Sequence, residues 1–170
     1  MRARLIAALL AGLPLASSPA LAQINGAAFS GFSGDSKQPI NIEAAELEVI
    51  DGEKRAVFKG NVRVTQGKST IQTSRLEVIY SGDGQGGQGD ISMLNLSGGV
   101  VAKSDGNTAS GDAGSFDVKR EIVTLSGEVV LSQGPNVAKG CKLVASLKQN
   151  TANLTRCKGQ RVITSIQPND

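Results

Sequence analysis

The sequence predicts an all-β fold, a twisted and partly open antiparallel β-jellyroll built from repeated hairpins. A short phrase occurs three times, at 58–62, 96–100 and 125–129, and places a large apolar residue, a central glycine and a valine in the same order. Its apolar positions keep the period of two that is typical of strands. No segment of helical length keeps the three-to-four spacing of an amphipathic helix. Repeated strands without helices therefore define the fold class.

The repeats also predict the shape of the sheet. Gly60 and Gly98 are 38 residues apart, whereas Gly98 and Gly127 are 29 apart, which favours a coiling stack of hairpins with loop insertions over a strict solenoid. Glycine inside a strand usually marks a sharp bend or a close approach of two backbones. We therefore expect a bent, twisted sheet with an interior and two ends.

Alternation of apolar and polar residues gives the individual strands. It runs over 40–50, 56–65, 76–80, 93–100, 123–131 and 143–147. Asp51-Gly52 and Gln66-Gly67-Lys68 are turn signals, and the glycine-rich stretch 81–90 is predicted to be a loop. Each strand should therefore have one apolar face and one hydrated face.

The first 22 residues are predicted to be a cleavable signal peptide. Arg2 and Arg4 precede an apolar run from Leu5 to Leu15, and the small residues around Ala22 fit a cleavage site. The run is about half the roughly 20 residues that a membrane-spanning helix needs. An uncleaved membrane anchor is the alternative.

The rest of the chain is expected to form one domain, with a flexible segment at 23–37, an ordered domain at 38–166 and a tail at 167–170. Without Arg2 and Arg4 the basic and acidic residues nearly balance, which argues against binding of nucleic acid. The chain has one Tyr, four Phe and no Trp. Its interior must therefore consist mainly of Val, Ile and Leu.

Two cysteines in an exported chain predict a disulfide. Cys141 and Cys157 flank a plausible hairpin tip at 148–150, so a cross-strand bridge is expected. A redox or metal-binding pair is the alternative, but the chain has no CxxC motif and no histidine to complete a metal site.

The catalytic inventory argues against an enzyme. Without histidine the chain cannot form a Ser-His-Asp triad, a papain-like pair or a histidine-ligated zinc site. The GxGxxG match at 84–89 opens no helix, and the partial calcium repeat at 86–90 occurs once, so a flexible loop explains both. Glu46 and Glu48 are expected to be solvated at the edge of the sheet. A hydrolase that uses two acidic residues is the alternative. We predict no cofactor and no bound metal.

Two stretches near the start and two near the end carry a family resemblance. The segment 38–43 followed by 58–67 resembles the opening of the OstA-like family of periplasmic lipopolysaccharide-transport proteins, and 140–143 with 158–164 resembles its end. The resemblance covers roughly 38–166. The cysteine pair departs from the pattern of that family and suggests an added covalent link near the C-terminal end.

The resemblance implies a periplasmic carrier whose interior is an apolar trough for the acyl chains of lipid A. Members of the family stack end to end and carry lipopolysaccharide from the inner-membrane complex to the outer-membrane assembly. The expected partners are therefore lipopolysaccharide, other copies of the chain, and membrane components of the export machinery that share the fold. An aliphatic wall suits this cargo, since burial gains roughly 0.8 kcal/mol per methylene.

Thirteen residues are candidates for the trough by their match to the family and their strand phase: Ile40, Ile42, Leu47, Val49, Phe58, Val62, Val64, Leu76, Val78, Leu96, Val100, Leu125 and Val129. Lys59 and Arg63 belong to the opposite face and are expected to be solvated. Plain packing in a closed β-sandwich would bury the same apolar residues. An exported structural or adhesive β-protein is therefore the main alternative, and a membrane-anchored or outer-membrane member of the same transport system is another.

Overall fold

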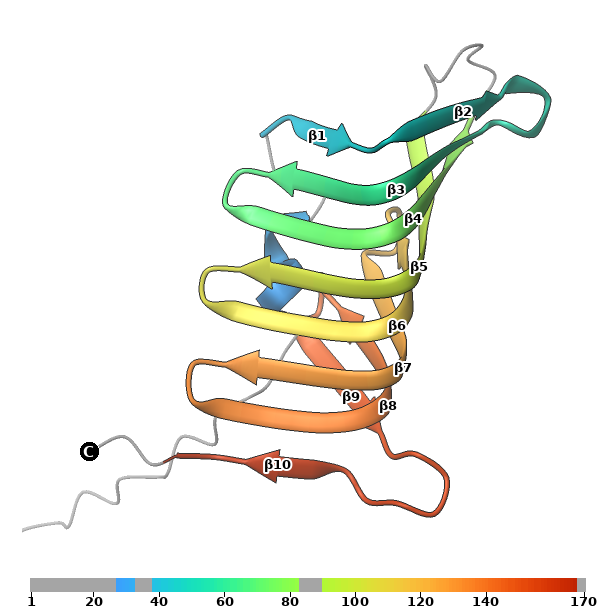
Figure 1. Cartoon of the computed structure of the whole chain (residues 1–170). Coiled ribbons are helices and arrows are strands. Elements are labelled where there is room, and N and C mark those ends of the chain that lie inside the picture. The colour runs from blue at the N-terminus through green and yellow to red at the C-terminus, as the bar shows by residue number, and fades with distance from the viewer. Residues whose placement is uncertain (1–26, 33–37, 83–89, 168–170) are drawn as a thin grey trace, which may run out of the picture.

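A computed structural model describes residues 27–32, 38–82 and 90–167. Ten strands in these ranges form one antiparallel sheet (Figure 1). The strands are β1 (Ile40–Glu43), β2 (Glu46–Ile50), β3 (Arg55–Gln66), β4 (Ser69–Ser81), β5 (Asp90–Ser104), β6 (Asn107–Asp117), β7 (Ile122–Gln133), β8 (Asn136–Ser146), β9 (Thr151–Thr155) and β10 (Ile163–Ser165). Two short 3-10 helices, η1 (Ala27–Phe32) and η2 (Asp51–Glu53), complete the described part. The predicted all-β fold, an open antiparallel sheet built from repeated hairpins, is confirmed.

Several predictions concern residues that the structure does not describe. The signal peptide at 1–22, nearly all of the glycine-rich loop with its GxGxxG match, and the last three residues of the tail lie outside the described ranges. Among the residues that are described, no helix has the length and apolar character needed to cross a membrane.

The sheet is a meander with two ends. Each strand from β3 to β8 pairs with the next one along the chain. At the first end β1 and β2 both pair with β3, and at the last end β9 and β10 both pair with β8. In Figure 1 these ends lie at the top and bottom of the stack. The turns at 51–53 and 67–68 join strands where the sequence predicts them.

The repeat glycines bend the sheet. Gly60, Gly98 and Gly127 all have positive φ, and each lies at a shift in strand register. Only glycine adopts this backbone conformation without steric cost. At Gly98 a Cβ atom would also lie 2.7 Å from Ser74 Cβ. The predicted bend and close approach at the repeat glycines are therefore both present, and the aligned bulges turn the strands together.

The bend encloses an aliphatic interior. Leu76, Val78 and Leu143 are fully buried there, and most of the other buried side chains are Val, Leu, Ile or Ala. Dense packing of such side chains is the main source of stability in a fold of this size. The expectation that Val, Ile and Leu form the interior therefore holds for the described residues.

None of the strands predicted from the sequence corresponds to β6. Its inward positions include Ala109, Gly114 and Phe116, so its apolar face is made partly of small residues. The small side chains leave room for larger neighbours, since a Cβ on Gly114 would lie 2.9 Å from Leu125 Cδ2. A strand with such small inward residues gives little hydrophobic signal in the sequence.

Order also begins earlier than expected. The sequence places a flexible segment at 23–37, but residues 27–32 form η1, with Ala28, Phe29 and Phe32 buried in the core cluster. The physical reason is that two of the four phenylalanines of the chain lie in this glycine- and serine-rich segment and find an apolar surface to cover.

The predicted disulfide joins Cys141 in β8 to Cys157, with 4.9 Å between their Cα atoms. Cys157 lies just beyond the end of β9, which pairs with β8 across the predicted hairpin. The bridge therefore fastens the segment that follows β9 to the last long strand of the stack.

Candidate ligand-binding trough

Most of the thirteen candidate residues line the interior of the bent sheet. Eight are buried in the core cluster: Val62, Val64, Leu76, Val78, Leu96, Val100, Leu125 and Val129. Ile42 and Phe58 are partly buried against the same cluster. The structure thus brings ten of the thirteen together, from β1, β3, β4, β5 and β7. We call this aliphatic interior the trough.

The other three candidates are exposed at the first end. Ile40, Leu47 and Val49 have 46%, 58% and 53% of their surface exposed. Leu47 pairs with Phe58 and Val49 with Ala56, so both continue the inward face of β3. They stay exposed because β1 and β2 are the outermost strands at this end of the sheet.

A small apolar cavity remains in the trough, beside Phe32 of η1. Its volume is about 160 Å³, below the roughly 300–1,000 Å³ of a typical small-molecule pocket. Its lining is apolar except for one residue, Gln66, and comprises Phe32, Ile40, Ile42, Val64, Gln66, Leu76, Ile91, Leu94, Phe116 and Val118. Helix η1 supplies Phe32, so the chain itself fills part of the space between the strands.

Some of these lining residues are absent from the candidate set. Phe116 and Val118 extend the inward face of β6, and Ile91 lies at the start of β5. Leu94, also on β5, faces the interior as well. The alternation of Gly114, Phe116 and Val118 is the one signal in the sequence that could have identified β6.

One side of the trough ends in polar groups, at the turns that join β3 to β4 and β5 to β6. Ser69 Oγ donates to Ser104 Oγ at 2.8 Å, and both residues are buried. Gln66 Nε2 donates to the carbonyl oxygen of Gln38 at 3.0 Å, while Gln66 Oε1 is buried without a partner. We call Gln66, Ser69 and Ser104 the polar rim. An aliphatic wall that ends in uncharged polar groups suits an amphipathic molecule.

Charged residues occupy the outer face. Lys59 Nζ contacts Glu48 Oε2 at 2.9 Å and lowers the pKa of that carboxyl group through a hydrogen bond. Arg55 Nη1 lies 2.6 Å from Glu77 Oε1, and this hydrogen bond lowers the pKa of Glu77. The pairs link β2 to β3 and β3 to β4. Lys59 is therefore on the solvated face, as predicted, and Glu48 forms an ion pair there.

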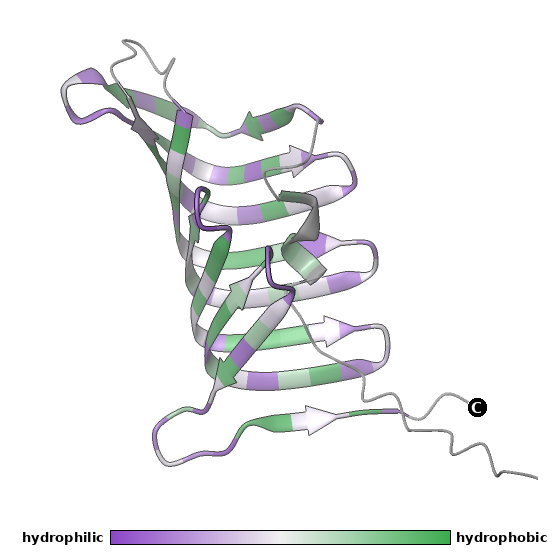
Figure 2. Cartoon of the chain, turned by 180° about the vertical axis from the view of Figure 1, so that it is seen from behind, coloured by the Kyte–Doolittle hydropathy of each residue, from purple (hydrophilic) through white to green (hydrophobic). Residues whose placement is uncertain are grey.

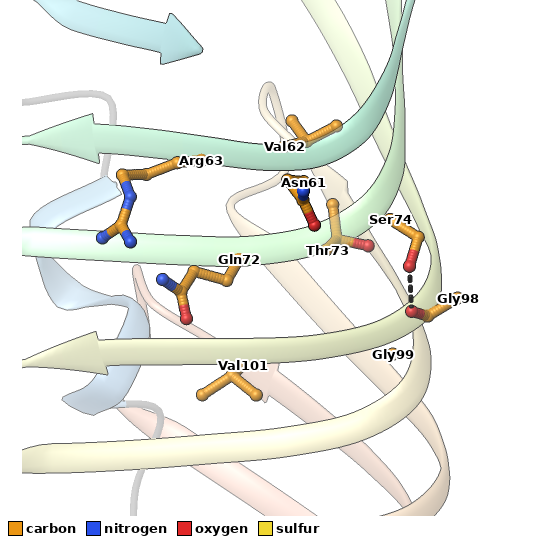
Figure 3. A pocket seen from close by; sticks show the side chains of 9 residues that line it. All are labelled: Asn61, Val62, Arg63, Gln72, Thr73, Ser74, Gly98, Gly99 and Val101. Atoms are coloured by element: carbon orange, nitrogen blue, oxygen red, sulfur yellow. Dashed lines mark hydrogen bonds between the residues drawn. The ribbon is translucent and has the colours of Figure 1, made fainter. Parts of the chain in front are cut away.

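A second cavity, of about 460 Å³, lies where the bulges of β3, β4 and β5 meet (Figure 3). Arg63 and Gln72 project side by side from paired positions, so Arg63 is solvated on the outer face as predicted. Ser74 Oγ donates to the carbonyl oxygen of Gly98 at 2.6 Å. Nowhere in the described ranges do three or more His, Cys, Asp or Glu side chains gather as a metal site would require.

Exposed apolar side chains gather at the two ends of the sheet. Seven large hydrophobic residues are exposed in the part of the chain that the structure describes: Ile40, Leu47, Val49, Val144, Val162, Ile163 and Ile166. All except Val144 lie in or beside β1, β2 or β10. Apolar side chains next to unpaired strand edges are typical of surfaces that other strands cover.

Comparison with known proteins identifies relatives for nearly the whole chain. An uncharacterised protein of Rhizobium meliloti is 37% identical over 161 residues, which cover 92% of this chain and 86% of that protein. The lipopolysaccharide export system protein LptA of Escherichia coli K12 is 30% identical over 163 residues, which cover 92% of this chain and 84% of that protein.

The fold has a counterpart among solved structures. It matches LptH of Pseudomonas aeruginosa with a TM-score of 0.66 and 23% identity, over 79% of this chain and 99% of that one. LptH is described as the LptA-homologous periplasmic component of the lipopolysaccharide transport device, which agrees with the predicted location. Residues 41–151 match the family described as LptA/(LptD N-terminal domain) LPS transport protein. The chain therefore belongs to the LptA/OstA family of lipopolysaccharide transport proteins, which confirms both the predicted family and its non-enzymatic class.

Proposed function

We propose that this chain works in the periplasm as a carrier that holds the acyl chains of lipopolysaccharide in the trough and joins other copies end to end into a bridge between the two membranes. The observation that carries the proposal is a continuous aliphatic interior in a sheet whose two ends are uncovered. The periplasmic homologue LptH and the predicted signal peptide support the location.

The aliphatic side chains that line the trough support acyl chains as the cargo. Val, Leu and Ile side chains present no charge and almost no hydrogen-bonding group to the interior, so they gain free energy from any hydrocarbon, roughly 0.8 kcal/mol per buried methylene. We expect a polar head group to leave the apolar wall at the polar rim, because the wall ends there in hydrogen-bonding groups. In a carrier of this type, affinity depends on how much of the acyl chain is buried more than on specific contacts with the lipid.

The ends support the bridge. Strands β1, β2 and β10 each pair on one side, which leaves backbone groups available to a neighbouring strand. Leu47 and Val49 at one end and Ile163 at the other would lose their exposed apolar surface when a second copy adds its edge strand. The same surfaces suit those membrane components of the transport machinery that share the fold.

Binding can be tested with the purified mature chain and purified lipopolysaccharide. We expect the lipid to comigrate with the protein in size-exclusion chromatography, and Phe58→Asp to weaken this binding about tenfold or more because the carboxylate would enter the trough. Lys59→Asp, its outward neighbour, is the matched control and should bind normally. A well-folded chain that takes up no lipid would favour the structural or adhesive alternative.

Assembly can be tested by charge at the ends. Leu47→Asp and Ile163→Asp should each abolish end-to-end association in analytical ultracentrifugation, because a buried unpaired carboxylate opposes docking. Lys103→Asp introduces the same residue on the outer face of β5, in the middle of the stack, and should associate normally. Equal association of all three variants would contradict the proposed end-to-end contact.

A further inference from the structure

Helix η1 lies inside the bend of the sheet. In Figure 1 it lies behind β4–β6, and in Figure 2, from the opposite side, it lies in front of them. It contacts all three of these strands. Phe29 and Phe32 are only 3% and 7% exposed and belong to the same core cluster as Leu76, Leu96 and Phe116. Residues 27–32 therefore cover part of the trough wall.

We propose that the inner faces of β4, β5 and β6 beneath η1 are an acyl-chain binding site, and that η1 occupies this site until a fatty acyl chain displaces it. The site is apolar and includes Phe116, Leu94 and Ile91, which also line the cavity beside Phe32. The inference rests on the proposed function, since it names the part of the trough that the first acyl chain enters.

The volume beside η1 makes displacement necessary. The open space there is about 160 Å³, and the liquid volume of a single water is about 30 Å³, so only a short piece of hydrocarbon fits while Phe32 stays in place. A lipid with several acyl chains needs the volume that Phe29 and Phe32 fill. Side chain and acyl chain therefore compete for one aliphatic surface.

The helix is suited to leave. It has six residues and belongs to no strand pair, whereas every strand around it is held by a ladder of backbone hydrogen bonds. Isolated helices of this length are unstable in water, so η1 depends on the contacts of its buried side chains. A ligand that takes over the wall removes those contacts.

A tryptophan reporter tests displacement directly, because the chain has no Trp. In Phe32→Trp the emission should be blue-shifted in the free protein and should shift to the red when purified lipopolysaccharide binds. Phe116→Trp, on β6 in the same cavity, is the matched control. Its emission should stay blue, and a fatty acid brominated on its chain should quench it.

The two reporters also separate this inference from the proposed function. Quenching of Trp at position 116 with no red shift at position 32 would overturn the displacement of η1 and leave lipid binding in place. If neither reporter responds to lipid in folded protein, the proposed trough function fails as well.

Affinity gives a second test. If the site is free in about one molecule in ten, Phe29→Ser with Phe32→Ser should tighten lipopolysaccharide binding about tenfold, because the fraction of competent molecules rises to nearly one. Phe29→Leu with Phe32→Leu keeps apolar side chains and should bind like the unsubstituted chain. Unchanged or weaker binding by the folded serine variant would mean that η1 is a permanent part of the wall, contrary to the proposal.

Discussion

The middle of the stack and its two ends use the same kinds of side chain for different purposes. Leu76 on β4 is fully buried, whereas Leu47 on β2 is 58% exposed, although both follow the inward face of the sheet and both lie opposite Phe58. In the middle, a strand is paired on each side, as β3 and β5 are with β4. At the ends only one side is covered.

Strand phase therefore decides which residues face the trough, while position in the stack decides whether they contribute to stability. An exposed leucine at the first end gains its burial only when another molecule docks there. Substitutions in the middle should therefore change folding, and substitutions at the ends should change association.

The largest effect is expected for truncation of a leucine. Leu76→Ala should lower the free energy of unfolding by about 2–5 kcal/mol because it leaves a cavity in a fully buried position. Leu47→Ala should lower it by less than about 0.5 kcal/mol in the monomer. Urea denaturation monitored by circular dichroism measures both values. Similar losses would contradict the distinction between the middle and the ends.

The disulfide should matter at the last end. The bridge between Cys141 and Cys157 closes a loop with a sequence separation of 16, for which the chain-entropy account gives about 3 kcal/mol. Replacing both cysteines by serine should lower stability by up to that amount. Hydrogen exchange should show that β9 and β10 lose amide protection first, while β4 stays protected. Uniform loss of protection would mean that the last end does not open on its own.

Glycine substitutions separate the bend from an end turn. Gly98→Ala should lower stability by about 1–3 kcal/mol, because alanine is strained at positive φ and its Cβ would meet Ser74. Gly52→Ala, in the turn at the first end, has no atom within 4 Å of its Cβ position and no positive φ, and should change stability little. Thermal denaturation of the two variants is a direct comparison, and equal midpoints would show that the bulge tolerates a side chain.

The smallest effect concerns pH. The hydrogen bond from Arg55 lowers the pKa of Glu77, so the ionised carboxylate contributes stability that is present above the pKa of an unfolded glutamate and lost as the pH falls through the lower folded value. Glu77→Gln should reduce this dependence below about pH 4.5 and leave it unchanged near neutrality. Unfolding measured from pH 3 to pH 7 tests the sign, and an identical profile in the variant would show that the pair is not coupled to folding.

Strand phase, bends and the disulfide could be predicted because each has a local cause. The repeat glycines mark bulges, and alternation at 56–65 gives the inward residues of β3. Two cysteines in a chain with a predicted signal peptide indicate a disulfide. Family likeness added the trough, which local patterns do not distinguish from a closed core.

The rest depends on tertiary contacts. Strand β6 carries small inward residues, and its pairing follows from its long neighbours β5 and β7 more than from its own hydrophobicity. Helix η1 is stable only where its phenylalanines meet the trough wall, so its glycine- and serine-rich sequence predicts flexibility. The exposure of Ile40, Leu47 and Val49 depends on the end of the stack, which strand phase does not encode.

Photo-crosslinking in cells, with the reactive residue placed at Phe58 and separately at Lys59, tests lipid binding in the trough directly. We predict an adduct that migrates with lipopolysaccharide at Phe58, on the trough face, and none at Lys59, which lies on the outer face with Glu48. Absence of a lipid adduct at Phe58, and likewise at Val62 and Leu125, in well-expressed protein would contradict this prediction and mean that the interior is a closed core.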